Sequence, residues 1–366
     1  MGKSVTISVT NDISTDQRVL RSAAFLHHKN YQVTIIGRKR KDSLPVPDLA
    51  YRFIRMRLLF NKGPLFYAEY NLRLFLVLLS LKKTHLFSND LDTLLPNYLA
   101  HVVQPKTRII YDAHEYFTGV PELSNRPFVQ KIWKMIEKTI IPKLGKMITV
   151  NTSIAALYHK DYGQSVKVIR NIGKRPSSTV SRPADLPDCE NLIILQGAGI
   201  NIDRGGEEAI LAMQYLDNYH LMIVGSGDAI DTLQKMRSEH QLEDRITFYG
   251  KKPYVTLLAY TQAAKVGLSL DKPSNINYQY SLPNKIFDYI HSHTAVVASN
   301  LIEIKRIVED YNVGYIVKTH DPKMIAEAIK KAVADYDRKI FEEGFRKAKE
   351  TLTWEKESRI LDEFFE

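Results

Sequence analysis

Residues Asn275–Asn300 read N-I-N-Y-Q-Y-S-L-P-N-K-I-F-D-Y-I-H-S-H-T-A-V-V-A-S-N. The pattern predicts a polar loop, a helix over 283–291 and a buried strand over 295–298. Ser281 is a residue type that caps helices, and Pro283 suits the first helical turn, where a missing N–H costs little. An ordinary helix–strand unit of an α/β domain explains the same pattern. The rest of the chain is therefore needed to decide whether this stretch also has a functional role.

The predicted helix start has the chemistry of a phosphate site. Its first N–H groups have no partner within the helix, and the positive end of the helix dipole points the same way. Lys285 adds a cation there. Asp288 follows Asn284 by one turn, roughly 6 Å along the axis at about 1.5 Å per residue. A diphosphate at the helix start would therefore place a ribose near the Asp288 carboxylate.

Size and composition favour a globular protein of more than one domain without disulfide bonds. The chain has 366 residues, of which 44% are hydrophobic, so we expect about two domains. Residues 1–4 lead straight into an apolar strand, and we expect no signal peptide. The longest apolar run, near 74–81, falls short of the ~20 residues that span a bilayer. The single cysteine, Cys189, excludes an internal disulfide framework. A cytoplasmic location is expected.

Charge divides the chain into a basic and an acidic half. Residues 1–175 carry 28 basic and 12 acidic side chains, hence +16, and the remainder carries 23 and 29, hence −6. A basic half favours anionic partners. We expect peripheral attachment to the inner face of a membrane through basic residues that bracket large apolar ones. The alternative is a helix over 65–81 that packs on the sheet beside solvated cations. The basic residues are Arg52, Arg55, Arg57, Lys62, Lys82 and Lys83.

Two series of strands alternate with helices, so we predict an α/β protein with two parallel sheets. The first series covers 5–10, 31–36, 84–87, 108–112, 147–150 and 166–169, and the second covers 192–197, 220–224, 246–249, 266–270 and 295–298. A stretch over 170–190, rich in proline, serine and charge, has the composition of a linker. Ligands of such sheets bind at the carboxyl ends of strands. Three of these ends carry polar side chains: Asn11, Asp12 and Asp16; Asn89, Asp90 and Asp92; and Asp112, His114 and Glu115.

Several motifs in order carry a resemblance to a known family. They are D-Q-R at 16–18, Y-D-A-H-E-Y at 111–116, Q-G-A-G at 196–199, D-R-G-G at 203–206, G-S-G at 225–227 and S-L-P-N-K-I-F-D-Y at 281–289. With these motifs the chain resembles the family-4, or group 1, glycosyltransferases of the GT-B fold. The resemblance implies two Rossmann-like domains facing a cleft. We place them at 1–175 for the acceptor and 176–350 for the nucleotide sugar, with a helix over 351–366 that returns to the first domain.

The resemblance also implies roles for individual residues. Arg204 and Lys285 would hold the donor diphosphate, Asp288 would bind the ribose, and His114 would face the donor sugar. His114, Arg204 and Lys285 are the candidate catalytic residues. The other donor-binding candidates are Gly197, Gly199, Gly225, Gly227, Gly250, Lys251, Asn277, Tyr280, Pro283 and Asn284. Asp16, Arg18 and Asp90 are the candidates on the acceptor side.

Two positions depart from the family's residues, and the first lies in a pattern of two glutamates separated by seven residues. Asp288 fills the second place, but Tyr280 stands in the first, which normally contacts the sugar. Ala198 stands where many members have an arginine. Sugar recognition would then pass to the polar residues of the preceding loop, which are Asn275, Asn277, Tyr278 and Gln279.

The expected reaction is transfer of a sugar from a nucleotide-diphosphate donor to a carbohydrate or lipid-linked acceptor, in polysaccharide or glycolipid assembly. The resemblance implies a retaining reaction without cofactor or metal. Two alternatives stay open. A nucleotide-sugar 2-epimerase would need no acceptor and several catalytic carboxylates. A non-catalytic nucleotide-binding protein is favoured if Tyr280 blocks the sugar pocket. Nucleic acid is not an expected partner, because the basic half contains no recognisable module.

Overall fold

The computed structural model describes residues 2–14, 16–41, 43, 45–46, 48–120, 123, 126–173 and 181–365. The chain forms two compact units. The first comprises residues 1–171 and 357–366, and the second comprises residues 172–356. Our expected borders were 175/176 and 350/351; the first of these, with residues 174–180 of the predicted linker, lies outside the described residues.

Sheet A of the first unit has seven parallel strands within the described residues, in the order β3-β2-β1-β4-β5-β6-β7. Its central strands are buried on both faces, as expected for a parallel sheet that helices cover. The strands are β1 (Ser4–Asp12), β2 (Gln32–Arg38), β3 (Arg52–Met56), β4 (His85–Asn89), β5 (Arg108–Ala113), β6 (Met147–Thr149) and β7 (Val166–Val168).

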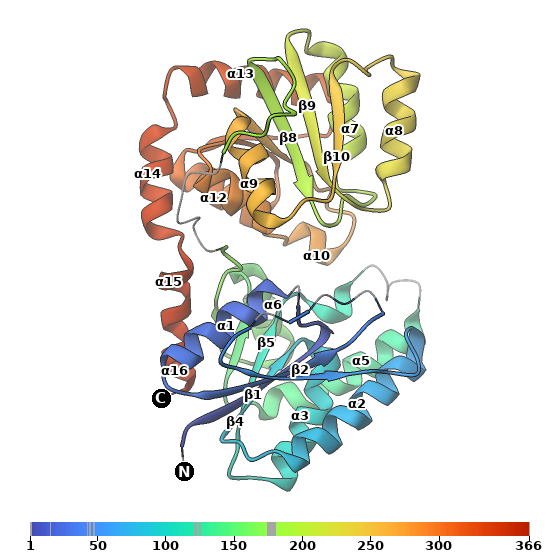
Figure 1. Ribbon diagram of the computed structural model, residues 1–366, viewed down its shortest axis with the longest axis vertical. Helices are drawn as coiled ribbons and strands as arrows, with labels where there is room; N and C mark the ends of the chain where they lie inside the picture. Colours follow the sequence, from blue (N-terminus) through green and yellow to red (C-terminus); the bar gives the residue numbers. More distant parts are fainter. Residues whose placement is uncertain are drawn as a thin grey trace. The chain divides into compact units, whose positions relative to one another are not determined.

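Helices lie on both faces of sheet A (Figure 1). α2 (Gly63–Ser80), α3 (Leu91–Val103) and α5 (Pro127–Ile140) form one layer, and α1 (Gln17–His28) and α6 (Thr152–Tyr162) lie on the opposite face. Short 3-10 turns occur at η1 (Phe117–Gly119) and η2 (Ile141–Lys143). Within the described part of the chain, every helix falls short of the length or apolarity that crossing a bilayer requires.

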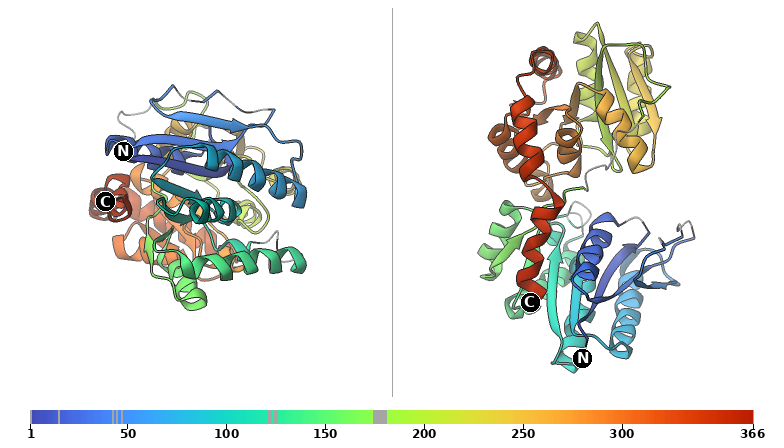
Figure 2. Two further views of the ribbon diagram at one scale, coloured as in Figure 1. Left: turned by 90° about the horizontal axis from the view of Figure 1, so that it is seen from below. Right: turned by 60° about the vertical axis from the view of Figure 1, so that its left-hand side comes forward.

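The C-terminal residues of the chain pack into the first unit (Figure 2). The segment contains the end of α15 (Trp354–Glu357), η4 (Ser358–Leu361) and α16 (Asp362–Phe365). The Tyr31 hydroxyl donates to the carbonyl of Phe365, whose ring packs edge-on against Tyr31 and Phe87. Glu357 pairs with Arg170 at 2.6 Å. These contacts tie the end of the chain to the strands of sheet A.

Sheet B of the second unit has six parallel strands among the described residues, in the order β10-β9-β8-β11-β12-β13. Its strands are β8 (Asn191–Gly197), β9 (Tyr219–Gly225), β10 (Ile246–Gly250), β11 (Val266–Ser269), β12 (Ala295–Ser299) and β13 (Gly314–Val317). Its helical elements are α7 (Gly206–Ala212), η3 (Met213–Tyr215), α8 (Ile230–Glu239), α9 (Tyr254–Ala263), α10 (Ile276–Gln279), α11 (Asn284–His291), α12 (Ile302–Tyr311), α13 (Pro322–Asp337) and α14 (Glu342–Thr351). The prediction of two parallel sheets is confirmed.

Three local features differ from the predictions. The strands β3 and β13 are additional to the predicted ones. The loop before the key helix contains the short helix α10, capped by Asn275, whose side chain accepts from the N–H of Tyr278 at 3.0 Å. Ser281 as N-cap is wrong, because the N-cap of α11 is Pro283. A proline disfavours helical conformation in the residue before it, here Leu282, so a helix that starts directly after Ser281 is disfavoured.

Candidate functional site

Two cationic side chains lie close together at the start of α11 in the second unit. Arg204 lies in the loop between β8 and α7, and Lys285 lies in the first turn of α11. Arg204 Nη1 lies 3.1 Å from Asp271 Oδ2, and Lys285 Nζ lies 3.9 Å from Asp271 Oδ1. The Arg204 guanidinium also lies over the Tyr278 ring, 4.0 Å from its centroid. The structure thus brings two predicted phosphate ligands to one carboxylate beside an uncapped helix start.

Asp271 is the residue of this cluster that the sequence analysis missed. Its side chain is completely buried, and it directly follows Leu270 at the end of the predicted strand 266–270. The rule that functional side chains follow the carboxyl ends of strands could have found it. Burial lowers the pKa of Lys285; Asp271 opposes that shift, and Arg204 adds to it. The carboxylate therefore keeps two like charges close together.

Two glycines of the predicted donor loops are required by close backbone contacts. Gly225 has φ +150°, and a Cβ there would lie 1.9 Å from the carbonyl oxygen of Gly197. Gly205, directly after Arg204, has φ +75°, and a Cβ there would lie 2.3 Å from the Leu270 side chain. A side chain would therefore separate the loop of Arg204 from the end of the strand that precedes Asp271.

Asp288 is buried and oriented by neighbouring side chains. The Tyr254 hydroxyl donates to Oδ1 at 2.7 Å, and Gln196 Nε2 donates to Oδ2 at 3.2 Å. Gln196 is itself fixed, because its Oε1 accepts from the Thr261 hydroxyl at 2.6 Å. These contacts fix the orientation of the Asp288 carboxylate, which can accept about four hydrogen bonds when ionised.

The remaining donor-side candidates lie on three segments of the second unit. Asn277 and Tyr280 are half-buried on and after α10, and Asn284 is exposed at the start of α11. Gly199 and Gly227 flank the contact of the β8 and β9 loops, where the N–H of Ile200 donates to Ser226 O. Gly250 is the last residue of β10. Lys251 follows it directly and is exposed.

A second cluster occupies the carboxyl ends of β4 and β5 in the first unit. Arg18 makes two hydrogen bonds to Asp112, at 2.7 and 2.9 Å, and both side chains are buried. His114 Nε2 lies 3.2 Å from Asn89 Oδ1 and 3.5 Å from Asp112 Oδ2. Asp90 faces the other ring nitrogen at 3.2 Å. Three predicted residues, Arg18, Asp90 and His114, are therefore brought together here.

Electrostatics favour a charged imidazole in this cluster. Burial alone lowers the pKa of His114, but Asp90 and Asp112 outweigh it and hold that pKa well above its usual value. Burial also raises the pKa of Asp112, but Arg18 and His114 hold it well below the usual range. Both ring nitrogens face oxygen acceptors, so protonation of both is the form that satisfies this geometry. His114 is placed as a cation rather than as a base.

Asp16 and Asp92 occupy supporting positions near this cluster. The Asp16 side chain caps α1, accepting from the N–H of Val19 at 3.1 Å. The Thr10 hydroxyl donates to Asp92 at 2.5 Å. Burial and the nearby Asp90 raise the pKa of Asp92 to about 7. Asp92 is one of the polar residues predicted at strand ends, and its burial is not evident from its residue type.

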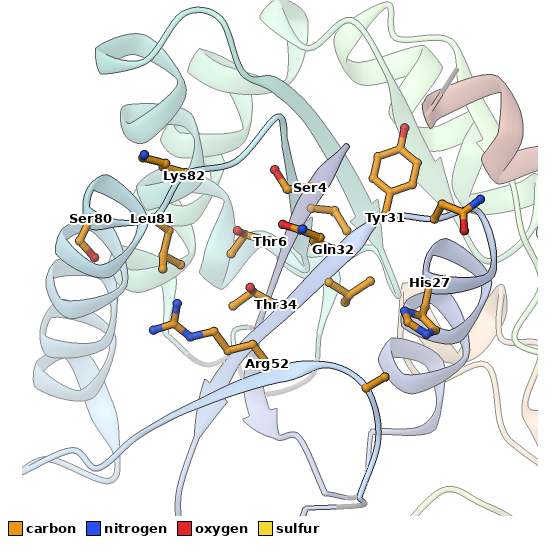
Figure 3. A pocket seen from close by; sticks show the side chains of 14 residues that line it. Ser4, Thr6, His27, Tyr31, Gln32, Thr34, Arg52, Ser80, Leu81 and Lys82 are labelled. Atoms are coloured by element: carbon orange, nitrogen blue, oxygen red, sulfur yellow. The ribbon is translucent and has the colours of Figure 1, made fainter. Parts of the chain in front are cut away.

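A cavity of about 760 Å³ lies elsewhere in the first unit (Figure 3). Ser4, Thr6, Thr34 and Arg52 line it from the amino-terminal ends of β1, β2 and β3. The cluster around His114 lies at the carboxyl ends of the strands, so this cavity is separate from the candidate site.

Residues 181–348 match the family model described as glycosyl transferases group 1. The match lies within the second unit and confirms the resemblance to group 1 glycosyltransferases. This match and the fold support glycosyl transfer as the activity. No curated protein matches the chain in sequence.

Solved structures show the same GT-B fold over almost the whole chain. Sucrose-phosphate synthase from Thermosynechococcus elongatus has 17% identity and a TM-score of 0.79, with 99% of this chain and 98% of that chain covered. HepE from Anabaena, in complex with UDP and glucose, has 12% identity and a TM-score of 0.72, with 99% of each chain covered. A mutant of TarM from S. aureus, in complex with Fondaparinux, alpha-GlcNAc-glycerol and UDP, has 11% identity and a TM-score of 0.74, also with 99% of each covered.

Proposed function

We propose that this protein transfers a sugar from a nucleotide-diphosphate donor to an acceptor hydroxyl. One observation carries the proposal: Arg204 and Lys285 converge on Asp271 beside the uncapped start of α11. Two cations and a helix start without a side-chain cap match a diphosphate. Asp288 lies one helical turn beyond Asn284, where its carboxylate can accept from ribose hydroxyls.

The largest requirement of the reaction is stabilisation of the departing diphosphate. The bond between the anomeric carbon and the phosphate oxygen breaks through an oxocarbenium-like state, and negative charge gathers on the phosphate. Arg204, Lys285 and the α11 amides supply preorganised positive charge for it. In a retaining reaction without metal, the new bond forms on the same face of the sugar, and the acceptor proton passes to the departing phosphate. His114, held as a cation, is then an electrostatic partner and not the proton acceptor.

The donor we propose first is a uridine-diphosphate hexose. HepE was solved with UDP and glucose, and the TarM mutant with UDP; these ligands are theirs, and they support the choice of the first donor to test. We propose a carbohydrate or lipid-linked acceptor in cell-surface polysaccharide or glycolipid assembly, and a cytoplasmic enzyme attached peripherally to the membrane. The basic first half of the chain supports that location.

The test separates this function from its two alternatives. Release of UDP from UDP-hexoses is measured with and without acceptor, and the sugar product is analysed. Arg204→Ala and Lys285→Ala are expected to weaken UDP binding at least tenfold. The matched control is Lys272→Ala, since Lys272 follows Asp271 but pairs with Glu208 at 2.6 Å. An isomerised sugar without acceptor would indicate the epimerase, and UDP binding without turnover of any donor would indicate a binding protein.

A further inference from the structure

The helix layer formed by α2, α3 and α5 exposes several large apolar side chains. Each helix of the layer buries one side, as Phe66, Leu94 and Trp133 show. The outward side nevertheless carries large apolar groups, with Phe128 74% exposed and Leu72 61% exposed. The outward residues are Leu65, Leu72, Leu76, Leu99, Val102, Val103, Phe128, Ile132 and Met135. Single exposed apolar residues need no explanation, but a set on one layer marks an interaction surface.

α5 has the most regular pattern of the three helices. Phe128, Ile132 and Met135 recur at spacings of four and three, so they form one stripe. Lys131, Lys134 and Lys138 follow along one flank of that stripe, and all three are exposed. An apolar stripe beside a row of lysines is the pattern of a helix that lies in the interface of a membrane.

The exposed charges of the helix layer are positive. Among the described residues of α2, α3 and α5 there are three acidic side chains, and none of them is exposed on the outward side. Asp92 and Glu137 are buried. Glu69 accepts from the N–H groups of Leu59 and Phe60 and pairs with Arg73. An anionic surface therefore meets exposed lysines, and none of the acidic side chains described in these three helices is exposed among them.

The helices of the layer are locked together. The Trp133 ring of α5 packs edge-on against Tyr67 of α2 and Phe117 of η1, with centroids 5.2 Å apart in both pairs. Below them, the Glu137 carboxylate accepts from the Thr118 and Tyr162 hydroxyls at 2.9 and 2.8 Å. α5 is thus fixed from its buried side, and its outward stripe is presented in one orientation.

We propose that the helix layer docks on the surface of an anionic phospholipid bilayer, with the α5 stripe among the headgroups. This inference rests on the proposed function and specifies its membrane contact. It differs from the contact expected from the sequence. Arg55 is 13% exposed and pairs with Asp12 at 3.1 Å, and the Lys83 ammonium donates to the carbonyls of Leu78 and Leu81. A second copy of the chain fits the layer less well, because lysines would face lysines.

The test is flotation of the full chain with vesicles of phosphatidylcholine alone or with phosphatidylglycerol, at low and high salt. Wild type is expected to bind the anionic vesicles at low salt and to be released by salt. The variants F128S/I132S/M135S and K131Q/K134Q/K138Q are each expected to bind at least tenfold less. The matched control K235Q/K305Q/K323Q removes three exposed lysines from the second unit and is expected to bind as wild type.

UDP binding in solution is measured on every variant to separate the two proposals. Loss of vesicle binding with intact UDP binding in the α5 variants supports the docking surface. Equal vesicle binding by all variants, or none by wild type at low salt, overturns it. A wild-type dimer that the α5 substitutions dissociate, seen by light scattering, also overturns it in favour of a second copy. Vesicle binding by a wild-type protein that does not bind UDP would support the docking surface and contradict the proposed function.

Discussion

The Asp90 carboxylate holds His114 by both of its oxygens. Oδ2 lies 3.2 Å from the imidazole Nδ1, and Oδ1 accepts from the backbone N–H of His114 at 2.8 Å. Asp90 reaches this position with φ +59°, a conformation that non-glycine residues rarely adopt. Such strain persists where the surrounding structure imposes it, and functional sites are common among those places.

His114 is expected to remain protonated at neutral pH. Asp90 and Asp112 raise its pKa against the effect of burial, so the charged form is favoured in the folded protein. Because the pKa is higher in the folded state, protonated His114 adds to the free energy of unfolding. The whole contribution is present below about pH 6.5, and it is lost as pH rises through the pKa of the folded state. Nitrogen-15 spectra of the imidazole should show both nitrogens protonated at pH 7.5. Asp90→Asn should lower this pKa; a neutral ring in wild type at that pH would contradict the assignment.

Glu137 is expected to make the first unit less stable as pH rises. Burial raises the pKa of Glu137 to about 7, despite the hydroxyls of Tyr162 and Thr118. The folded state therefore holds a proton that the unfolded state releases at a lower pH, and stability falls between about pH 4.5 and pH 7. The full effect is on the order of 3 kcal/mol.

Glu137→Gln tests this directly. The amide keeps an oxygen that can accept from Thr118 and Tyr162, and it does not ionise. Chemical unfolding should show that the variant gains stability relative to wild type at pH 8.5 but not at pH 5. A difference that is the same at both pH values would show that the carboxyl does not titrate in this range.

The alternation of strands and helices could be predicted because apolar, β-branched runs mark strands that are buried on both faces. β3 was not predicted because Arg52 and Arg55 interrupt its apolar residues, which neither alternate with polar ones nor form a continuous run. An edge strand tolerates such charge, and Asp12 from β1 pairs with Arg55. The same residues were interpreted as a membrane contact, since a sequence does not show which cations are paired.

The motif residues of the second unit were predictable because Arg204 and Lys285 stand in recognisable local patterns. Asp271 was not, because its role depends on two side chains that are distant in sequence and meet only in the fold. The exposed stripe of α5 was hidden for a similar reason. Periodicity shows that a helix has two faces, but only the packing of Trp133 shows which of them is buried.

Asp271→Asn is expected to destabilise the second unit and to make UDP more stabilising. Removing one partner of a buried ion cluster leaves its cations uncompensated, and such changes cost about 3–5 kcal/mol. The bound diphosphate would then replace the missing negative charge between Arg204 and Lys285. The rise in melting temperature on adding UDP should be larger in the variant than in wild type. Glu208→Gln, which removes the partner of Lys272, is the control and should show the wild-type rise.

Asp288→Asn is expected to weaken nucleotide binding through the ribose. A hydrogen bond to a charged group contributes about 1.5–3 kcal/mol, so UDP affinity should fall by about tenfold or more. Tyr254→Phe removes the hydroxyl that donates to Asp288 at 2.7 Å and should cost less, because the carboxylate itself remains. Calorimetry with UDP and with 2′- and 3′-deoxy-UDP completes a double-mutant cycle. If Asp288 contacts the ribose, one deoxy analogue should lose affinity for wild type but little more for Asp288→Asn. Losses that simply add for both analogues would place the ribose away from Asp288.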